Sequence, residues 1–147
     1  MYTNLLLATD GSTLSDHAVN HAIGLASKLG AKINCLYVAP DYPDPMLLDG
    51  GSMASPSHEE YVVAAAAAAK KILDRVSKKA AESGVECEGH HAISTAPSEA
   101  ILHAAKKLKC DAIVMGSHGR GGVAALLLGS QTQKVLAHTK LPVIVAR

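Results

Sequence analysis

The sequence contains no tryptophan and no phenylalanine, and its only aromatic residues are four tyrosines. The hydrophobic core therefore has to be built from Ala, Val, Ile and Leu, which pack well in layers of helices against a sheet. Proteins that bind single-stranded nucleic acid commonly stack the bases on aromatic rings. The shortage of rings nearly excludes that kind of binding platform.

The chain also lacks a strong excess of charge of either sign. Its formal net charge is +1, so no overall field attracts DNA, RNA or an anionic membrane. Hydrophobic residues make up 48% and charged residues 18%, which excludes a disordered chain. A length of 147 residues predicts one domain covering residues 1–147.

Cysteines are few and unpaired in the sequence. Cys35, Cys87 and Cys110 lie far apart and form no C-x-x-C pair, which is typical of reduced thiols in a cytoplasm. The N-terminus has no basic region, and no apolar run approaches the roughly 20 residues that span a bilayer. We expect a soluble, cytoplasmic protein.

Short apolar runs alternate with longer helical patterns along the chain. The pattern predicts strands over residues 5–8, 33–38, 85–93, 111–115 and 142–146, and helices over residues 14–29, 58–83, 97–109 and 130–138. Residues 40–57 hold four of the six prolines and predict a long loop, which is usually functional or mobile. The polar residues of the third run predict a strand at the edge of the sheet. Strands alternating with helices predict an α/β fold with a parallel, doubly wound sheet.

In such a sheet, ligands bind beyond the carboxyl ends of the strands, where the strand order reverses. Two predicted strand ends carry unusual residues, namely Thr9-Asp10-Gly11-Ser12 and the glycine-rich segment that begins at Gly116. Ser130 falls where a helix is predicted to begin, and the free N–H groups of a first helical turn favour phosphate. No carboxylate side chain occurs after Asp111. These features predict a phosphate site.

Two common phosphate motifs fit less well. A Walker A loop requires G-x-x-x-x-G-K-[ST], and the residue directly before Ser130 is glycine, not lysine. The segment from Gly119 to Ala124 matches the relaxed dinucleotide pattern G-x-G-x-x-A. However, it follows the fourth predicted strand instead of the first, and no acidic residue lies downstream to hold a ribose.

Three segments in order resemble the universal stress protein family. They are residues 7–12 (LATDGS), residues 115–121 (MGSHGRG) and residues 141–145 (LPVIV). In the second segment, Gly116-x-x-Gly119 is followed after nine residues by Gly129-Ser130. The resemblance covers the whole chain. It implies a Rossmann-like, adenine nucleotide alpha hydrolase-like sheet with strand order 3-2-1-4-5, and a homodimer in which residues 142–146 pair with their symmetry mates. It also implies ATP binding, since the full glycine signature is present.

The resemblance further implies a set of nucleotide-binding residues. Asp10 would contact the ribose or adenine end, Val38 would read the adenine through its backbone, and Thr132 would lie one turn into the helix. Gln131 is a departure, because the family often has an apolar residue there, and we expect it to tune the site. The full set implied is Ala8, Thr9, Asp10, Val38, Met115, Gly116, His118, Gly119, Arg120, Gly129, Ser130, Gln131 and Thr132.

The residues predict a regulatory binding protein in preference to an enzyme. No nucleophile–base pair or set of metal ligands for phosphoryl transfer is evident, although a Mg²⁺ held mostly by the triphosphate is compatible with the site. A slow ATPase or phosphotransferase, and a nucleotide-independent dimeric interaction module, remain alternatives. His17 and His21 have helical spacing for a shared metal, but without a third ligand we expect them to face solvent. His118 is either a ligand contact or an exposed loop residue.

Overall fold

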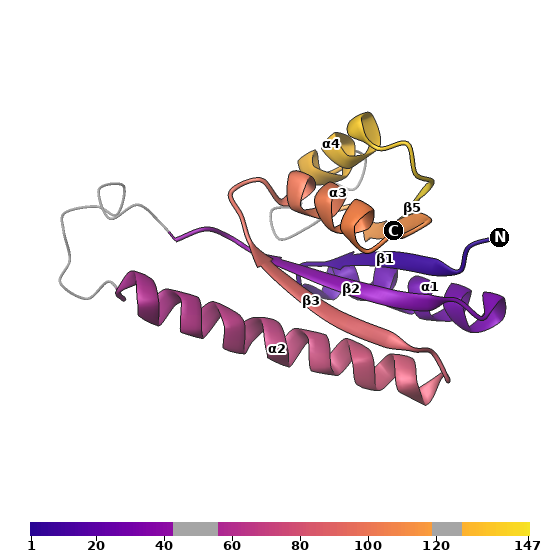
Figure 1. Cartoon of the computed structure of the whole chain (residues 1–147), viewed down its shortest axis with the longest axis horizontal. Coiled ribbons are helices and arrows are strands. Elements are labelled where there is room, and N and C mark those ends of the chain that lie inside the picture. Colours follow the sequence, from indigo (N-terminus) through magenta and orange to yellow (C-terminus); the bar gives the residue numbers. More distant parts are fainter. Residues whose placement is uncertain (43–55, 119–127) are drawn as a thin grey trace.

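The structure, a computed structural model, describes residues 1–42, 56–118 and 128–147. These residues form five strands and four helices that alternate along the chain (Figure 1). In chain order the elements are β1 (Asn4–Thr9), α1 (Thr13–Leu29), β2 (Lys32–Ala39), α2 (His58–Glu82), β3 (Cys87–Ile93), α3 (Pro97–Lys107), β4 (Ala112–Gly116), α4 (Ser130–His138) and β5 (Val143–Ala146).

The strands form one parallel sheet with the order β3-β2-β1-β4-β5, which confirms the predicted fold class and strand order. The predicted position of the third strand at an edge is also confirmed. All predicted element bounds are right to within two residues. The start of β3 is among the bounds that differ by two, because Val85 and Glu86 lie in the connection from α2 and the strand begins at Cys87.

Helices cover both faces of the sheet (Figure 1). Alternate side chains of a strand point to opposite faces, so Leu5 and Leu7 of β1 pack in the core under α1 and α2, whereas Leu6 packs in the core under α3 and α4. All three leucines are completely buried. The central strand thus anchors two aliphatic cores built without tryptophan or phenylalanine.

Local signals fix the ends of the first two helices. Ser12 caps the N-terminus of α1, and its hydroxyl oxygen accepts a hydrogen bond from the Ser15 N–H. Gly30 ends α1 with a φ of 65°, a left-handed conformation that glycine adopts without strain. At α2, Ser57 and Glu60 form a capping box, in which each side chain accepts from the other residue's backbone N–H.

A cluster of rings ties the end of β2 to the start of α2. Tyr42 makes edge-to-face contacts with His58 and Tyr61, at centroid distances of 5.4 and 5.3 Å. The Tyr42 hydroxyl donates to the Pro56 carbonyl, and the Tyr61 hydroxyl donates to the Pro40 carbonyl. We call this cluster of Tyr42, His58 and Tyr61 the ring clasp. Most of the predicted loop, residues 43–55, lies outside the described residues.

Among the described residues, no helix is long and apolar enough to cross a membrane.

Candidate functional site

The two predicted strand ends lie side by side at the carboxyl edge of the sheet. β1 and β4 are hydrogen-bonded neighbours, and Ala8 lies opposite Met115 in their register. The chain leaves β1 to reach β2 on one side, while β4 lies on the other side. The strand order therefore reverses between the end of β1 and the end of β4, which is where open α/β sheets bind ligands.

The turn after β1 is held by a network of short side chains. One carboxylate oxygen of Asp10 accepts hydrogen bonds from the backbone N–H of Ser12 at 3.0 Å and from its hydroxyl at 2.6 Å. The hydroxyls of Thr9 and Ser15 lie 2.9 Å apart, both in buried residues. Gly11, with a φ of 75°, makes the turn between them. The network fixes the position of Asp10 at the first turn of α1.

Ser15 was not predicted as part of this region. Its position three residues after an N-cap serine is the sequence signal that could have indicated it.

At the end of β4, Gly116 lets the backbone pass close to its neighbours. A Cβ atom at this position would lie 3.2 Å from the carbonyl oxygen of His118 and 3.8 Å from that of Leu14. The 3.2 Å contact is tighter than a Cβ normally makes, so a residue with a side chain would shift the turn. Gly116 therefore permits the tight turn that follows β4.

Hydrogen bonds connect this turn to the start of α4. The Thr132 hydroxyl donates to the Gly116 carbonyl at 3.0 Å, and the Gly129 N–H donates to the Ser117 carbonyl at 2.7 Å. Thr132 is buried, so its hydroxyl serves this internal bond. The N-terminus of α4 is consequently held at the carboxyl edge, beside the end of β4.

His118 carries a buried nitrogen without a partner among the described residues. Its Nδ1 lies 3.0 Å from the Ser117 hydroxyl, while its Nε2 is buried and makes no hydrogen bond with any described residue. Buried polar atoms in native structures almost always have a partner, because leaving one unsatisfied costs about 1–3 kcal/mol. The Nε2 of His118 is therefore a candidate contact for a ligand.

The first turn of α4 is free of capping side chains. Gly129 occupies the N-cap position, no side chain caps the helix, and no acidic residue lies in the first turn. Ser130 is exposed there. Among the described residues no side chain bonds the N–H groups of this turn, and these groups together with the positive end of the helix dipole suit an anion.

The Gln131 side chain lies toward the neighbouring helix. Its Oε1 accepts a hydrogen bond from the backbone N–H of Ser98 at 3.1 Å, in the first turn of α3. α3 has no capping side chain of its own at its N-cap, Ala96. Gln131 thus caps α3 from α4.

The remaining predicted residues are spread over the same edge. Ala8 and Val38 are half-buried and pack against the core under α3 and α4, and Met115 is buried in that core. Gly119 and Arg120 lie outside the described residues. The structure therefore brings together Thr9, Asp10, Gly116, His118, Gly129 and Ser130, and it places Val38 on β2, next to β1.

No group of three or more His, Cys, Asp or Glu side chains in the described part of the chain could hold a metal ion. His17 and His21 are exposed on α1, as predicted. The three cysteines are free, and Cys35 and Cys110 are buried. Burial raises the pKa of the Cys35 thiol, and it raises that of Cys110 to about 11, with the nearby charge of Asp111 adding to the effect. These thiols are protonated at neutral pH and are poor nucleophiles.

A parallel sheet between two helical layers, with its polar site at the point of strand reversal, defines a Rossmann-like α/β protein. The model of the universal stress protein family matches residues 1–147, and the chain belongs to that family. It is 36% identical over 151 residues to the "Universal stress protein in QAH/OAS sulfhydrylase 3′ region" of Thermus aquaticus, covering 100% of both chains. It is 32% identical over 149 residues to universal stress protein YxiE of Bacillus subtilis, again covering 100% of both.

Solved structures share the fold. Universal stress protein UspA from Lactobacillus plantarum superposes with a TM-score of 0.83 at 29% identity, covering 99% of this chain and 98% of that one. Three neighbours were solved with an adenine nucleotide: a universal stress protein in complex with cAMP (TM-score 0.70, 24% identity, 99% and 97% covered), one from Archaeoglobus fulgidus with dAMP (0.66, 20%, 99% and 98%) and one from Arabidopsis thaliana with AMP (0.67, 19%, 98% and 90%).

Proposed function

We propose that this chain is a regulatory protein that binds an adenine nucleotide, with ATP as the working ligand, at the carboxyl edge between β1 and β4. The observation that carries the proposal is the buried Nε2 of His118, which has no partner among the described residues and lies in the turn bonded to the start of α4. The nucleotide complexes of structures with the same fold support the choice of ligand class.

In this proposal the phosphates lie at the first turn of α4, where Ser130 and the backbone N–H groups donate hydrogen bonds. His118 donates from Nε2, its ring being oriented by the Ser117 hydroxyl 3.0 Å from Nδ1. Gly116, Gly119, Arg120 and Gly129 surround the ribose and phosphates. A Mg²⁺ ion would be held mostly by the triphosphate in this proposal. The described residues contain no cluster of side chains that could hold it by themselves.

The base lies toward β2 in this proposal. The backbone of Val38 reads the adenine, and Ala8, Thr9 and Met115 complete the wall. Asp10 hydrogen-bonds the ribose, because its carboxylate is already oriented by Ser12. With no tryptophan or phenylalanine in the chain, aliphatic walls and backbone hydrogen bonds hold the base in place of ring stacking.

The protein acts as a homodimer in this proposal, through residues 142–146. The Ile113 N–H donates to the Pro142 carbonyl and the Ser117 N–H donates to the Ala146 carbonyl. Backbone groups alternate in direction along a parallel ladder, so those of Val143 and Val145 face the open edge. These side chains are only half-buried, so a second copy of β5 would cover apolar surface and satisfy the edge. A single domain over residues 1–147 and a cytoplasmic location, consistent with free cysteines, complete the proposal.

Isothermal titration calorimetry with ATP, AMP and cAMP, with and without Mg²⁺, tests the site. We expect His118→Ala and Ser130→Ala each to weaken ATP binding by about tenfold, in line with a lost hydrogen bond to a charged group. His103→Ala is the matched control, because His103 is exposed on α3. Failure of all three nucleotides to bind the native protein would refute the proposal and favour a nucleotide-independent module. Steady ATP turnover that disappears in Ser130→Ala would favour the slow ATPase.

Sedimentation velocity tests the dimer separately. A lysine on an open strand edge discourages pairing, so Val145→Lys is expected to convert the dimer to monomer. A native protein that sediments as a monomer at all concentrations would contradict this part of the proposal.

A further inference from the structure

The positive and negative charges of this nearly neutral chain are separated along the sequence. Asp111 is the single carboxylate side chain after Glu99, whereas half of the 14 Lys and Arg residues follow Glu99. The net charge of +1 is therefore the sum of an acidic first part and a basic last part. What matters for binding is where the fold places the basic part.

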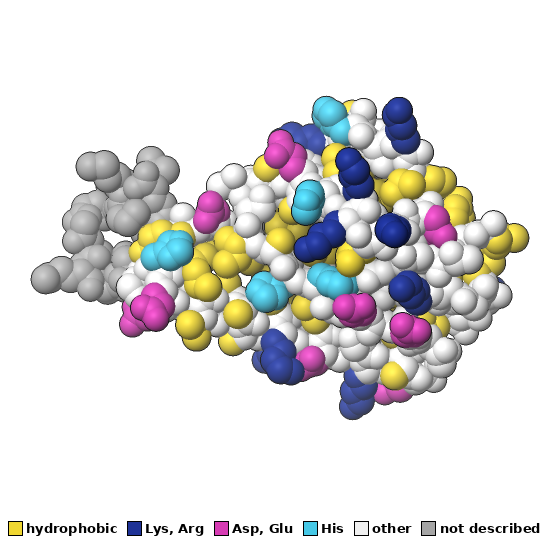
Figure 2. Space-filling model, viewed as in Figure 1, with side chains coloured by type: hydrophobic (Ala, Val, Ile, Leu, Met, Phe, Trp, Pro, Cys, Tyr) yellow, Lys and Arg dark blue, Asp and Glu magenta, His cyan; other side chains and the backbone are white. Residues whose placement is uncertain are grey.

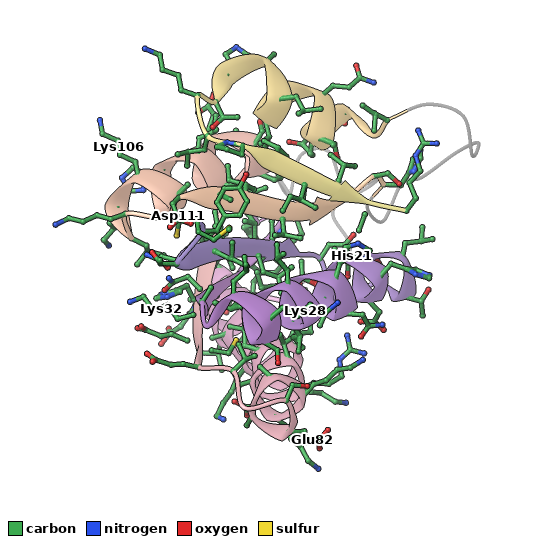
Figure 3. The ribbon with its side chains drawn as sticks, turned by 90° about the vertical axis from the view of Figure 1, so that its right-hand side faces the viewer. His21, Lys28, Lys32, Glu82, Lys106 and Asp111 are labelled. Carbon is green, nitrogen blue, oxygen red and sulfur yellow. The ribbon has the colours of Figure 1, made fainter. Side chains whose placement is uncertain are left out.

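The fold places five of these cations on one helical layer. α3 and α4 pack beside each other on the same face of the sheet, and both run back toward the edge where the strands begin (Figure 1). The exposed cations of these two helices and of the connections that follow them are Lys106, Lys107, Lys109, Lys134 and Lys140. Dark-blue side chains lie over these two helices in Figure 2, and in Figure 3 the Lys106 side chain extends away from the protein. We call this surface the α3–α4 face.

Little local negative charge balances the α3–α4 face. Glu99 lies in the first turn of α3, at the opposite end of that helix from Lys106 and Lys107. The Asp111 carboxylate accepts hydrogen bonds from the Thr3 N–H, the Thr3 hydroxyl and the Asn4 N–H. These hydrogen bonds hold the start of β1.

The other helical layer is balanced by comparison. On α2, five cations alternate with four carboxylates. Lys70 pairs with Asp74, and Arg75 pairs with Asp16 of α1 at 2.9 Å. Within the described ranges, no Lys or Arg of α3 or α4 forms an ion pair. The α3–α4 face therefore carries an excess of positive charge, with five lysines against Glu99 and Asp111.

The types of side chain on the α3–α4 face indicate which kind of anionic partner it can bind. α3 and α4 contain no arginine, which is the side chain preferred for bidentate phosphate contacts, and no tryptophan, tyrosine or phenylalanine ring to stack on a base or to lie in a membrane interface. Instead, Leu136 on α4 is 41% exposed and offers an apolar contact. Lysines that share a helical layer with an exposed leucine match an acidic segment with an apolar side chain better than they match a nucleic acid or a lipid surface.

We propose that the α3–α4 face is a docking surface for an acidic segment of a partner protein, with glutamate or aspartate side chains opposite Lys106, Lys107 and Lys140 and an apolar side chain against Leu136. The surface is separate from the proposed nucleotide site. The C-termini of α3 and α4 lie toward the amino edge of the sheet, whereas the nucleotide would bind at the carboxyl edge.

A purely structural role for the lysines has to be distinguished from docking. Cations in the last turn of a helix stabilise it through the helix dipole, and Lys106 and Lys107 occupy the last turn of α3. Lys79 lies in the last turn of α2, with Lys78 immediately before it, and both are exposed. Lys78→Glu/Lys79→Glu is therefore a control that matches Lys106→Glu/Lys107→Glu in charge change and exposure and lies near the C-terminus of a helix.

The experiment uses a fluorescein-labelled synthetic peptide in which glutamates alternate with leucines, titrated with the full chain and followed by fluorescence anisotropy. We expect binding that weakens as NaCl is added. Reversing Lys106 and Lys107 should weaken it by about tenfold or more, and reversing Lys78 and Lys79 by less than about twofold. Leu136→Ala should weaken binding without changing its salt dependence.

Equal weakening by the two charge reversals would refute the proposal, because net charge alone would then explain the binding. So would tighter binding of duplex DNA or of phosphatidylserine vesicles than of the peptide under the same conditions. Absence of peptide binding at low salt also refutes it. Thermal melts of both double variants confirm that each is folded, and ATP titration of both shows whether the nucleotide site is unaffected.

Discussion

Substitutions of Gln131 can distinguish an effect on the stability of the fold from an effect on nucleotide affinity more clearly than substitutions of any other described residue of the site. Its Oε1 accepts the hydrogen bond of the Ser98 N–H, and Ser98 is buried. Gln131→Ala leaves this N–H without a partner, which costs about 1–2 kcal/mol. For a chain of this length that lowers the melting temperature by roughly 3–8 °C. Gln131→Glu keeps the acceptor oxygen, so its stability should stay near that of the native protein.

The same glutamate should weaken nucleotide binding. It puts a carboxylate into the first turn of α4, which contains no acidic residue. Two unit charges about 7 Å apart in water repel by about 0.6 kcal/mol, so a multiply charged phosphate chain loses about 1–2 kcal/mol, or about tenfold in affinity. Ala137→Glu, exposed at the other end of α4, adds the same charge and should leave affinity within about twofold.

Thermal melts and ATP titrations of the three variants check both effects. If Gln131→Glu binds ATP as tightly as the native protein, the first turn of α4 does not hold the phosphates. If Gln131→Ala melts at the native temperature, the bond to Ser98 does not stabilise the pairing of α3 with α4.

Three further predictions concern the rest of the molecule. Asn34→Ala should lower the free energy of unfolding by about 2–4 kcal/mol in urea titrations, because the buried Asn34 amide hydrogen-bonds Asn4 Oδ1 at 2.6 Å and His90 Nε2 at 2.9 Å. As a control, Asn20→Ala should leave the free energy of unfolding unchanged, because Asn20 is exposed. Burial pushes the pKa of Asp111 up, but hydrogen bonds from Thr3 and Asn4 outweigh it and hold the pKa below its ordinary value. Its stabilisation is complete above the ordinary pKa and is lost as pH falls through the lower folded value, so between about pH 5 and 3 the native protein should lose more stability than Asp111→Asn. Cys35 and Cys110 should resist a thiol reagent until the protein is unfolded, and reaction of either at its unfolded rate in the native state would contradict their burial.

Much of this fold is predictable from the sequence because its local signals agree. The apolar run at residues 111–115 predicts a strand buried on both faces, and β4 is such a strand. Ser12 and Gly30 mark the two ends of α1 as N-cap and C-cap residues. Strand ends were predicted less well, because the ladder with the neighbouring strand decides them. β1 begins at Asn4, where its pairing with Lys32 begins.

Much less of the candidate site is predictable, because side-chain partners come from distant parts of the chain. The sequence predicted Asp10 and Gly116 at neighbouring strand ends, and the register of Ala8 with Met115 places them there. The partner of Gln131 lies 33 residues away on another helix, and no local pattern indicates it. The Asn34 network likewise joins residues from three strands, and the polar residue inside an apolar run was its only sign.

The ring clasp bears on where this chain tolerates an insertion. Tyr42, His58 and Tyr61 hold the two ends of residues 43–55 together, so the cost of closing that segment is met by contacts outside it. Doubling the length of a closed loop costs only about 0.6 kcal/mol. A chain built this way can accept foreign sequence between the clasped ends, such as an epitope or a binding peptide, while β2 and α2 keep their positions. The segment between the clasped ends is thus a suitable place to insert a foreign peptide.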